Sequence, residues 1–183
     1  MRKLILIDML SLDGFYEAPG EGWQTIDWHM VDDAWNELSI STLDATETLL
    51  FGRITYEGFR SFWPTRSDPI AQRINAKEKV VVTTTLKEAG WTNARLLTGD
   101  LNAGIKALKA APGGQIVIYG SGKLCRSLTA LGLIDEYHLA YAPVALGQGT
   151  PLFDPAAPRL QLKLNNVMPL PNGVLYARYS PAN

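Results

Sequence analysis

Short apolar runs alternate with longer amphipathic segments over most of the chain. An apolar run of about four to eight residues bounded by turn residues is typical of a strand covered on both faces. Six such runs are expected to be strands: Leu4–Met9, Thr48–Phe51, Lys79–Thr84, Arg95–Thr98, Ile116–Tyr119 and Tyr137–Tyr141. Segments with apolar residues at three- and four-residue spacing are expected to be helices: 32–43, 53–59, 102–109 and the segment from Gly122 that contains Leu124, Leu128 and Leu131.

The C-terminal part of the chain follows a different pattern. Leu160, Leu162 and Leu164 alternate with polar residues, which indicates a half-exposed strand. The pair Asn172-Gly173 then precedes another strand-like segment, Val174–Tyr179, and this arrangement predicts a β-hairpin. We therefore expect one domain over residues 1–183, with a mixed, mostly parallel sheet of about eight strands that ends in an antiparallel hairpin.

Composition narrows the classes of partner. The chain has 183 residues and a formal net charge of −1, so electrostatics give no reason to expect a nucleic acid or an anionic membrane. The single cysteine, Cys125, excludes an intrachain disulfide and a cysteine metal cluster, and we expect no metal site. No apolar run reaches the ~18 residues of a membrane span. Asp8 interrupts the first run before it reaches the length of a signal-peptide core, and we expect a cytoplasmic protein.

The stretch Gly120-Ser121-Gly122-Lys123 is the most informative for chemistry. It joins a predicted buried strand to a predicted helix. Such a turn presents unpaired backbone N–H groups and the positive end of the helix dipole, and both favour a phosphate. The alternative is that the glycines only allow a tight turn, because the stretch is neither a complete dinucleotide fingerprint nor a Walker loop.

A second strand-to-helix junction repeats this arrangement. Gly52 ends a predicted strand, Arg53 adds a guanidinium suited to phosphate, and Thr55 adds a hydroxyl at the helix start. The alternative is an ordinary helix start with a solvated arginine. Thr83, Thr84 and Thr85 end another strand, at the sheet edge where α/β proteins usually bind ligands.

Carboxylates near the same edge could orient or protonate a substrate if burial raised their pKa. Asp13 lies in the turn Ser11-Leu12-Asp13-Gly14, and Asp32-Asp33 begin the first predicted helix. The alternatives are structural: Asp13 can bond to its own turn, and the pair can complement the helix dipole.

Taken in order, these motifs resemble the dihydrofolate reductase superfamily and, more closely, the RibD C-terminal domain family, the reductase domain of a riboflavin-biosynthesis enzyme. The segments that carry the resemblance are Ser11–Phe15, Leu49–Tyr56, Val80–Thr85, Ile118–Leu124, Leu133–Leu139 and Ala142–Phe153. They cover nearly the whole chain. The deaminase domain and its zinc motif are absent from the sequence, so the resemblance is to a stand-alone reductase domain.

The resemblance implies a three-layer α/β/α fold and NADPH as the cofactor. Gly52, Arg53 and Thr55 would then meet the cofactor's phosphates. Thr83, Thr84 and Thr85 would lie by the 2′-phosphate. The pyrophosphate would be wrapped by Gly120, Ser121, Gly122, Lys123 and Leu124. Related reductases carry a cis peptide bond at this turn, so one is expected between Gly120 and Ser121.

The resemblance also places the substrate ring between the first strand and the helix that starts near Asp32. The substrate-binding candidates are Met9, Asp13, Trp28 and Asp33. A proton would come from Asp33, from Asp13 or from a bound water. The spacing from Asp33, or from Asp32 beside it, to Gly52 does not match the family's pattern, so folate is not assigned as the substrate. The substrate is left open, because loop residues line that pocket.

Two functions from different classes remain. One is an NADPH-dependent reductase that transfers hydride to a small heterocyclic substrate, as a pyrimidine reductase or a dihydrofolate reductase does. The other is a non-catalytic protein that binds NADPH or another small ligand on the same scaffold, including an antifolate-like ligand. The oligomeric state is left open, with a homodimer as one candidate and the C-terminal hairpin as its candidate interface.

Overall fold

The computed structural model describes residues 1–182, apart from the side chain of Trp23. Within this part the chain forms ten strands, five α-helices and one 3-10 helix. The strands are β1 (Leu4–Leu10), β2 (Phe15–Glu17), β3 (Thr46–Gly52), β4 (Glu78–Val82), β5 (Ala94–Leu97), β6 (Gln115–Tyr119), β7 (Glu136–Tyr141), β8 (Thr150–Pro151), β9 (Leu162–Pro169) and β10 (Leu175–Pro181). The helices are η1 (Gly22–Ile26), α1 (Asp33–Ala45), α2 (Arg53–Phe62), α3 (Pro69–Ala76), α4 (Leu101–Ala110) and α5 (Gly122–Ala130).

Eight strands form one sheet in the order β5-β4-β3-β6-β1-β7-β10-β9. The first six of these are parallel, and β10 and β9 are antiparallel to their neighbours. This confirms the predicted mixed, mostly parallel sheet with a C-terminal hairpin. The hairpin turn contains Asn172-Gly173 as expected, and Gly173 has a φ of +89° that suits glycine.

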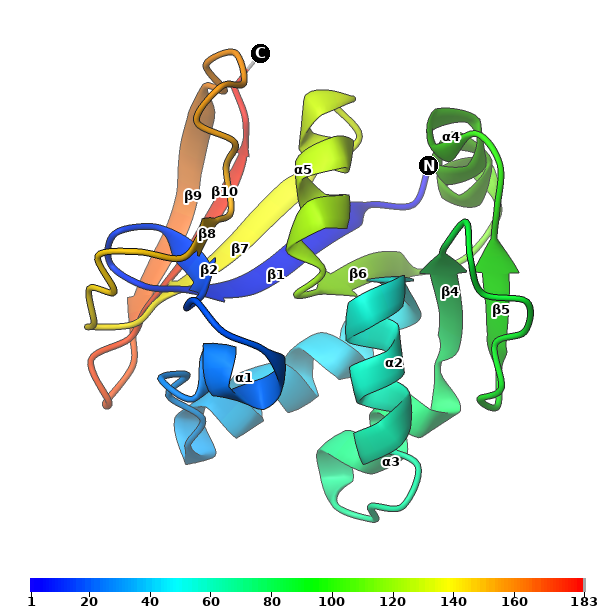
Figure 1. Cartoon of the computed structure of the whole chain (residues 1–183), viewed down its shortest axis with the longest axis horizontal. Helices are drawn as coiled ribbons and strands as arrows, with labels where there is room; N and C mark the ends of the chain where they lie inside the picture. Colours follow the sequence, from blue (N-terminus) through cyan, green and yellow to red (C-terminus); the bar gives the residue numbers. More distant parts are fainter. Residues whose placement is uncertain (183) are drawn as a thin grey trace.

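Helices cover both faces of the sheet, so the predicted three-layer arrangement is confirmed (Figure 1). Helices α1, α2 and α3 lie on one face, where Leu43, Tyr56 and Ile74 pack against the sheet residues Leu49 and Phe51. Helices α4 and α5 lie on the other face. There the buried residues are Leu4, Leu6, Leu50, Ile105, Leu108, Leu124 and Leu128.

The 3-10 helix η1 lies in a segment without a predicted element, and two further features were also not expected from the sequence. Helix α3 is one, although Asp68-Pro69 is a recognisable helix start: the Asp68 carboxylate accepts bonds from the N–H groups of Ile70 and Ala71. The other is the small antiparallel pair of β2 and β8. These strands are too short to show an alternating pattern, and only the folded chain brings them together. None of the described helices is long and apolar enough to cross a membrane.

Lys79 lies near the start of β4, at the amino-terminal end of the parallel strands. It is buried, with no surface accessible to solvent. Its Nζ donates to the carbonyl oxygens of Asn75 and Lys77 at 2.8 Å and of Thr92 at 3.1 Å. The ammonium also lies 4.5 Å from the centre of the Trp91 ring. Burial lowers its pKa to about 8. Lys79 therefore joins the end of α3 to the loop before β5.

We expect Lys79→Met to lower the free energy of unfolding by about 2–4 kcal/mol, because three carbonyl groups lose their donor inside the protein. Urea unfolding measures this change. Lys77→Met is the matched control, because the Lys77 ammonium has no such set of carbonyl partners among the residues that the structure describes. Equal stabilities for the two variants would contradict this role for Lys79.

Candidate cofactor site

Two helices start side by side at the carboxyl edge of the sheet. Strands β3 and β6 are parallel neighbours, and each is followed at once by a helix, α2 after Gly52 and α5 after the Gly120-Ser121 turn. The sequence predicted both junctions separately. The sheet order brings them together, because residues far apart in the chain end adjacent strands.

The two junctions touch each other. The backbone N–H of Gly52 donates to Ser121 Oγ at 3.1 Å. A Cβ atom on Gly120 would lie 3.6 Å from Thr55 Cγ2, so the first turn of α2 packs against the glycine turn. A Cβ atom on Gly52 would similarly meet Leu124 Cβ at 3.6 Å. Five of the predicted cofactor-binding residues therefore form one contiguous surface.

Neither helix start has a side-chain cap. Helices α1, α3 and α4 each begin with an aspartate whose carboxylate accepts a bond from the first turn: Asp32, Asp68 and Asp100. At α2 the cap position is Gly52, which has no side chain, and at α5 the Ser121 side chain makes no cap bond. The first N–H groups of a helix have no partner within the helix. Two adjacent uncapped starts form a surface suited to an anion.

The glycine turn differs in one detail from the expectation. No cis peptide bond occurs among the described residues, so the predicted cis bond between Gly120 and Ser121 is wrong. Instead, both residues are left-handed, with φ of +58° at Gly120 and +64° at Ser121. Left-handed backbone is uncommon for serine. The hydrogen bond from Gly52 to Ser121 holds that residue in place.

Cationic side chains flank this surface. Arg53 and Lys123 are exposed on the first turns of α2 and α5. Arg53 Nη1 bonds to Glu57 Oε2 at 2.7 Å, one turn further along the same helix. No other hydrogen bond of its guanidinium is found within residues 1–182, so its remaining donors are available to a phosphate.

The threonines after β4 fall into two groups. Thr83 is buried, and its Oγ1 accepts bonds from the N–H groups of Thr85 and Leu86, both at 3.1 Å. Thr83 therefore holds the turn. Thr84 and Thr85 are exposed at the same sheet edge, so their hydroxyl groups are accessible to a ligand.

The substrate-binding candidates also differ in their surroundings: Met9 and Trp28 pack in an apolar cluster, whereas Asp33 is exposed. Met9 and Trp28 belong to one apolar cluster beneath α1, together with Trp35. The Met30 N–H approaches Met9 Sδ at 3.3 Å, which fixes the loop before α1 against β1. Asp33 is exposed on the first turn of α1.

Asp13 is held by a different segment. Its carboxylate accepts bonds from the N–H groups of Leu146 at 3.1 Å and Gly147 at 2.7 Å. A hydrogen bond with the Ser11 side chain, followed by these backbone bonds, lowers the pKa of Asp13 to about 2. At neutral pH it is ionised, which suits a residue that anchors the loop after β7. The catalytic role of Asp13, like that of Asp33, stays a prediction.

Two residues next to the cofactor surface were missed from the sequence. Asp8 is buried in β1, and burial raises its pKa to about 8. Tyr16 on β2 lies directly against Gly122, where any Cβ atom would overlap its ring. The sequence shows Asp8 as a break in an apolar run, but its burial depends on β2 and α5.

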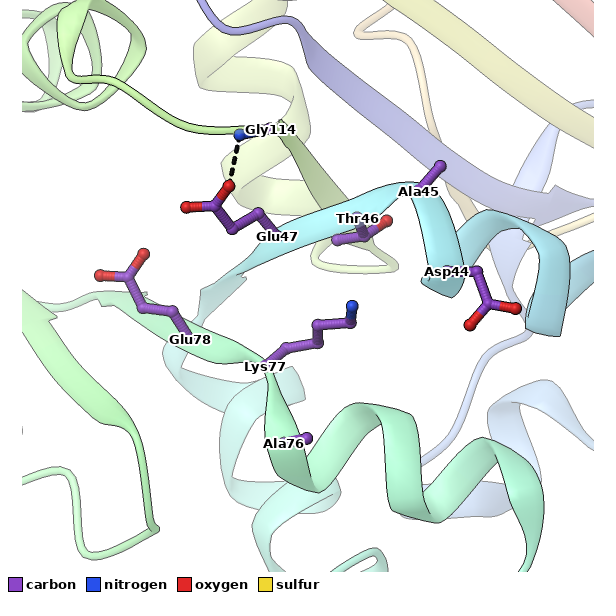
Figure 2. Close-up of a pocket in the computed structure, with 8 residues that line it drawn as sticks. All are labelled: Asp44, Ala45, Thr46, Glu47, Ala76, Lys77, Glu78 and Gly114. Atoms are coloured by element: carbon purple, nitrogen blue, oxygen red, sulfur yellow. Dashed lines mark hydrogen bonds between the residues drawn. The ribbon is translucent and has the colours of Figure 1, made fainter.

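The hollow drawn in Figure 2 lies at the opposite, amino-terminal end of the sheet. It has a volume of about 430 Å³ and is lined by Asp44, Ala45, Thr46, Glu47, Ala76, Lys77, Glu78 and Gly114. Its carboxylates already have partners: Asp44 pairs with Arg73, Glu78 pairs with Arg95, and Glu47 accepts a bond from the Gly114 N–H. It contains none of the predicted site residues. Among the described residues, no cluster of three or more His, Cys, Asp or Glu side chains could hold a metal ion.

Comparison with known proteins identifies the family. Residues 2–176 match the RibD C-terminal domain family. The chain belongs to the RibD C-terminal domain family. This RibD C-terminal domain is 30% identical to the uncharacterised Bacillus subtilis protein YyaP, over 97% of this chain and 94% of YyaP. It is 27% identical to the B. subtilis protein YwjB, also uncharacterised, over 89% of each chain.

Solved structures support the fold of this RibD C-terminal domain. A protein from Shewanella sp. PV-4 that is assigned to riboflavin biosynthesis aligns over 99% of both chains, with a TM-score of 0.76 and 22% identity. A pyrimidine reductase-like protein from Corynebacterium diphtheriae covers all of this chain, and 92% of that protein aligns, with a TM-score of 0.72 and 16% identity. RibD from Acinetobacter baumannii aligns over 59% of its own length, with a TM-score of 0.68 and 17% identity.

The raised pKa of Asp8 predicts how stability depends on pH. The folded pKa of about 8 exceeds the ~3.9 of an unfolded aspartate, so the folded state binds more protons between these values. The free energy of unfolding should therefore fall as the pH rises through this range. The Asp8→Asn variant should show a smaller decrease in the free energy of unfolding over this pH range. Urea unfolding at several pH values measures this decrease.

Asp13→Asn is the control, because the pKa of Asp13 is lowered to about 2. The pKa of Asp13 in the folded protein lies below its unfolded value. Its contribution to the free energy of unfolding is therefore lost only as the pH falls through the acid range. Identical pH profiles for wild type and Asp8→Asn would contradict the buried, neutral state of Asp8.

Proposed function

We propose that this RibD C-terminal domain is an NADPH-dependent reductase of a small heterocyclic substrate. The observation that carries the proposal is the pair of uncapped helix starts joined by the Gly52–Ser121 hydrogen bond. Membership of a reductase domain family supports it. The residues present fit a dinucleotide, because α2 and α5 offer unpaired N–H groups beside Arg53 and Lys123.

Each group has a distinct part in the proposal. The N–H groups of α5 would hold the pyrophosphate, and Arg53 with Thr84 and Thr85 would favour a 2′-phosphate, hence NADPH over NADH. When bound, NADPH supplies the hydride. Met9 and Trp28 would pack against the substrate ring, and Asp33 or a water beside it would supply the proton.

A substitution at Gly52 tests the proposed phosphate site without removing any contact of the core. Gly52→Asp would place a carboxylate at the start of α2, where it caps the helix but repels phosphate. Its φ of −78° is accessible to any residue. We expect NADPH affinity, measured by calorimetry, to fall at least about tenfold, with stability maintained.

Gly52→Asn is the matched control, since it caps the helix without a charge and should weaken binding less. Wild type should bind NADPH more tightly than NADH. If wild type binds neither at submillimolar concentration, or if Gly52→Asp binds NADPH as wild type does, the proposal is wrong.

A non-catalytic binding protein is the alternative function. The exposure of Asp33 favours it, as does the lowered pKa of Asp13, whose carboxylate is ionised at neutral pH and anchors a loop. The two functions differ in turnover. A reductase oxidises NADPH in the presence of a pterin, folate or ribosylaminopyrimidine, whereas a binding protein retains NADPH unchanged with all of them.

We also propose that a homodimer forms through β9. This edge strand has one charged residue, Lys163, and leaves Leu164, Val167 and Met168 40–51% exposed. Strand β9 lies at the edge of the sheet (Figure 1). An antiparallel edge can pair with a copy of itself across a twofold axis. Light scattering should give twice the 20.1 kDa chain mass, and Leu164→Glu should give the monomer. A monomeric wild type would contradict the proposal.

A further inference from the structure

Asp8 has an incomplete set of hydrogen bonds. It lies on β1 and is 7% exposed. Its Oδ1 accepts a bond from the Met9 N–H at 3.0 Å, while Oδ2 is buried and has no hydrogen-bond partner among the described residues. A buried carboxyl group with one unpaired oxygen lowers stability. Such a group is a candidate for a functional role.

The surroundings of Asp8 keep it neutral. Its side chain is on the α5 face of β1, where Tyr16 and Glu17 approach from β2 and Cys125 approaches from α5. None of these groups is cationic, and the Glu17 charge adds to the effect of burial in raising the pKa of Asp8. At neutral pH the group is therefore a carboxylic acid, with one O–H donor and one carbonyl acceptor.

Asp8 is also adjacent to the proposed pyrophosphate turn. The Gly120 N–H donates to the carbonyl of Ile7, the residue before Asp8, at 3.2 Å. The Cys125 thiol, which faces Asp8, donates to the Gly120 carbonyl at 3.1 Å. Tyr16 covers the same region through its contact with Gly122. A ligand that follows the turn toward the end of β1 would therefore meet Asp8 once Tyr16 moves aside.

We propose that Asp8 binds the carboxamide group of the nicotinamide ring, an inference that rests on the proposed NADPH binding. A neutral carboxylic acid and a primary carboxamide are complementary. The acid O–H donates to the amide carbonyl, and the acid carbonyl accepts from the amide N–H. The unpaired Oδ2 thereby obtains the partner that the protein itself does not provide.

Two ligands separate this contact from the phosphate contacts. NADPH contains the carboxamide, whereas 2′-phospho-ADP-ribose has the same phosphates and no nicotinamide. Asp8→Val should weaken NADPH at least about tenfold and change the affinity for 2′-phospho-ADP-ribose by less than about twofold. Calorimetry measures both affinities, so the test does not depend on turnover.

Asp8→Asn and pH provide a second test that does not require the valine variant to fold. An asparagine amide also pairs with a carboxamide, so Asp8→Asn should keep NADPH affinity from about pH 7 to about pH 9.5. Wild type should lose affinity for NADPH over this range as Asp8 ionises, and its affinity for 2′-phospho-ADP-ribose should change less. The Tyr16 and Cys125 pKa values are raised, so Asp8 ionises before them.

Different failures have different meanings. If Asp8→Val binds NADPH as wild type does, or if wild type and Asp8→Asn share one pH profile, the role of Asp8 is wrong while NADPH binding stands. If wild type binds neither ligand, the proposed function fails and this inference fails with it.

Discussion

The hydrogen bond from the Gly52 N–H to Ser121 Oγ joins the two halves of the candidate site. It uses the serine side chain that would otherwise cap α5, and it connects that helix to the start of α2. Helix α2 has no cap because Gly52 has no side chain, so two uncapped helix starts lie at one place on the sheet edge. Every cofactor contact that we propose depends on this placement.

A second constraint acts on the α5 face of β1. Tyr16 packs against Gly122, so residue 122 must be a glycine for β2 to lie over α5. That packing encloses Asp8 and keeps its carboxyl group neutral. The arrangement has a cost, because an unpaired carboxyl group lowers the stability of the fold. A protein can retain such a group when a ligand completes its hydrogen bonds.

The sequence predicted the parallel sheet, the hairpin and both glycine junctions, because apolar runs and turn residues are local signals. It did not predict α3 or the β2–β8 pair, whose segments are short and lack a clear period. It also could not show that Ser121 bonds to Gly52, that Asp13 anchors Leu146 and Gly147, or that Asp8 is enclosed. These contacts join segments far apart in the chain, and only the tertiary structure determines them.

Amide hydrogen exchange, compared with and without NADPH, tests the central claim most directly, because it reports on individual backbone N–H groups. We expect NADPH to slow exchange at residues 53–55 and 122–124, the first turns of α2 and α5. The capped first turns of α1, α3 and α4 should be much less affected. Protection confined to the hollow beside Glu47 and Glu78, or no protection at either uncapped turn, would contradict the account.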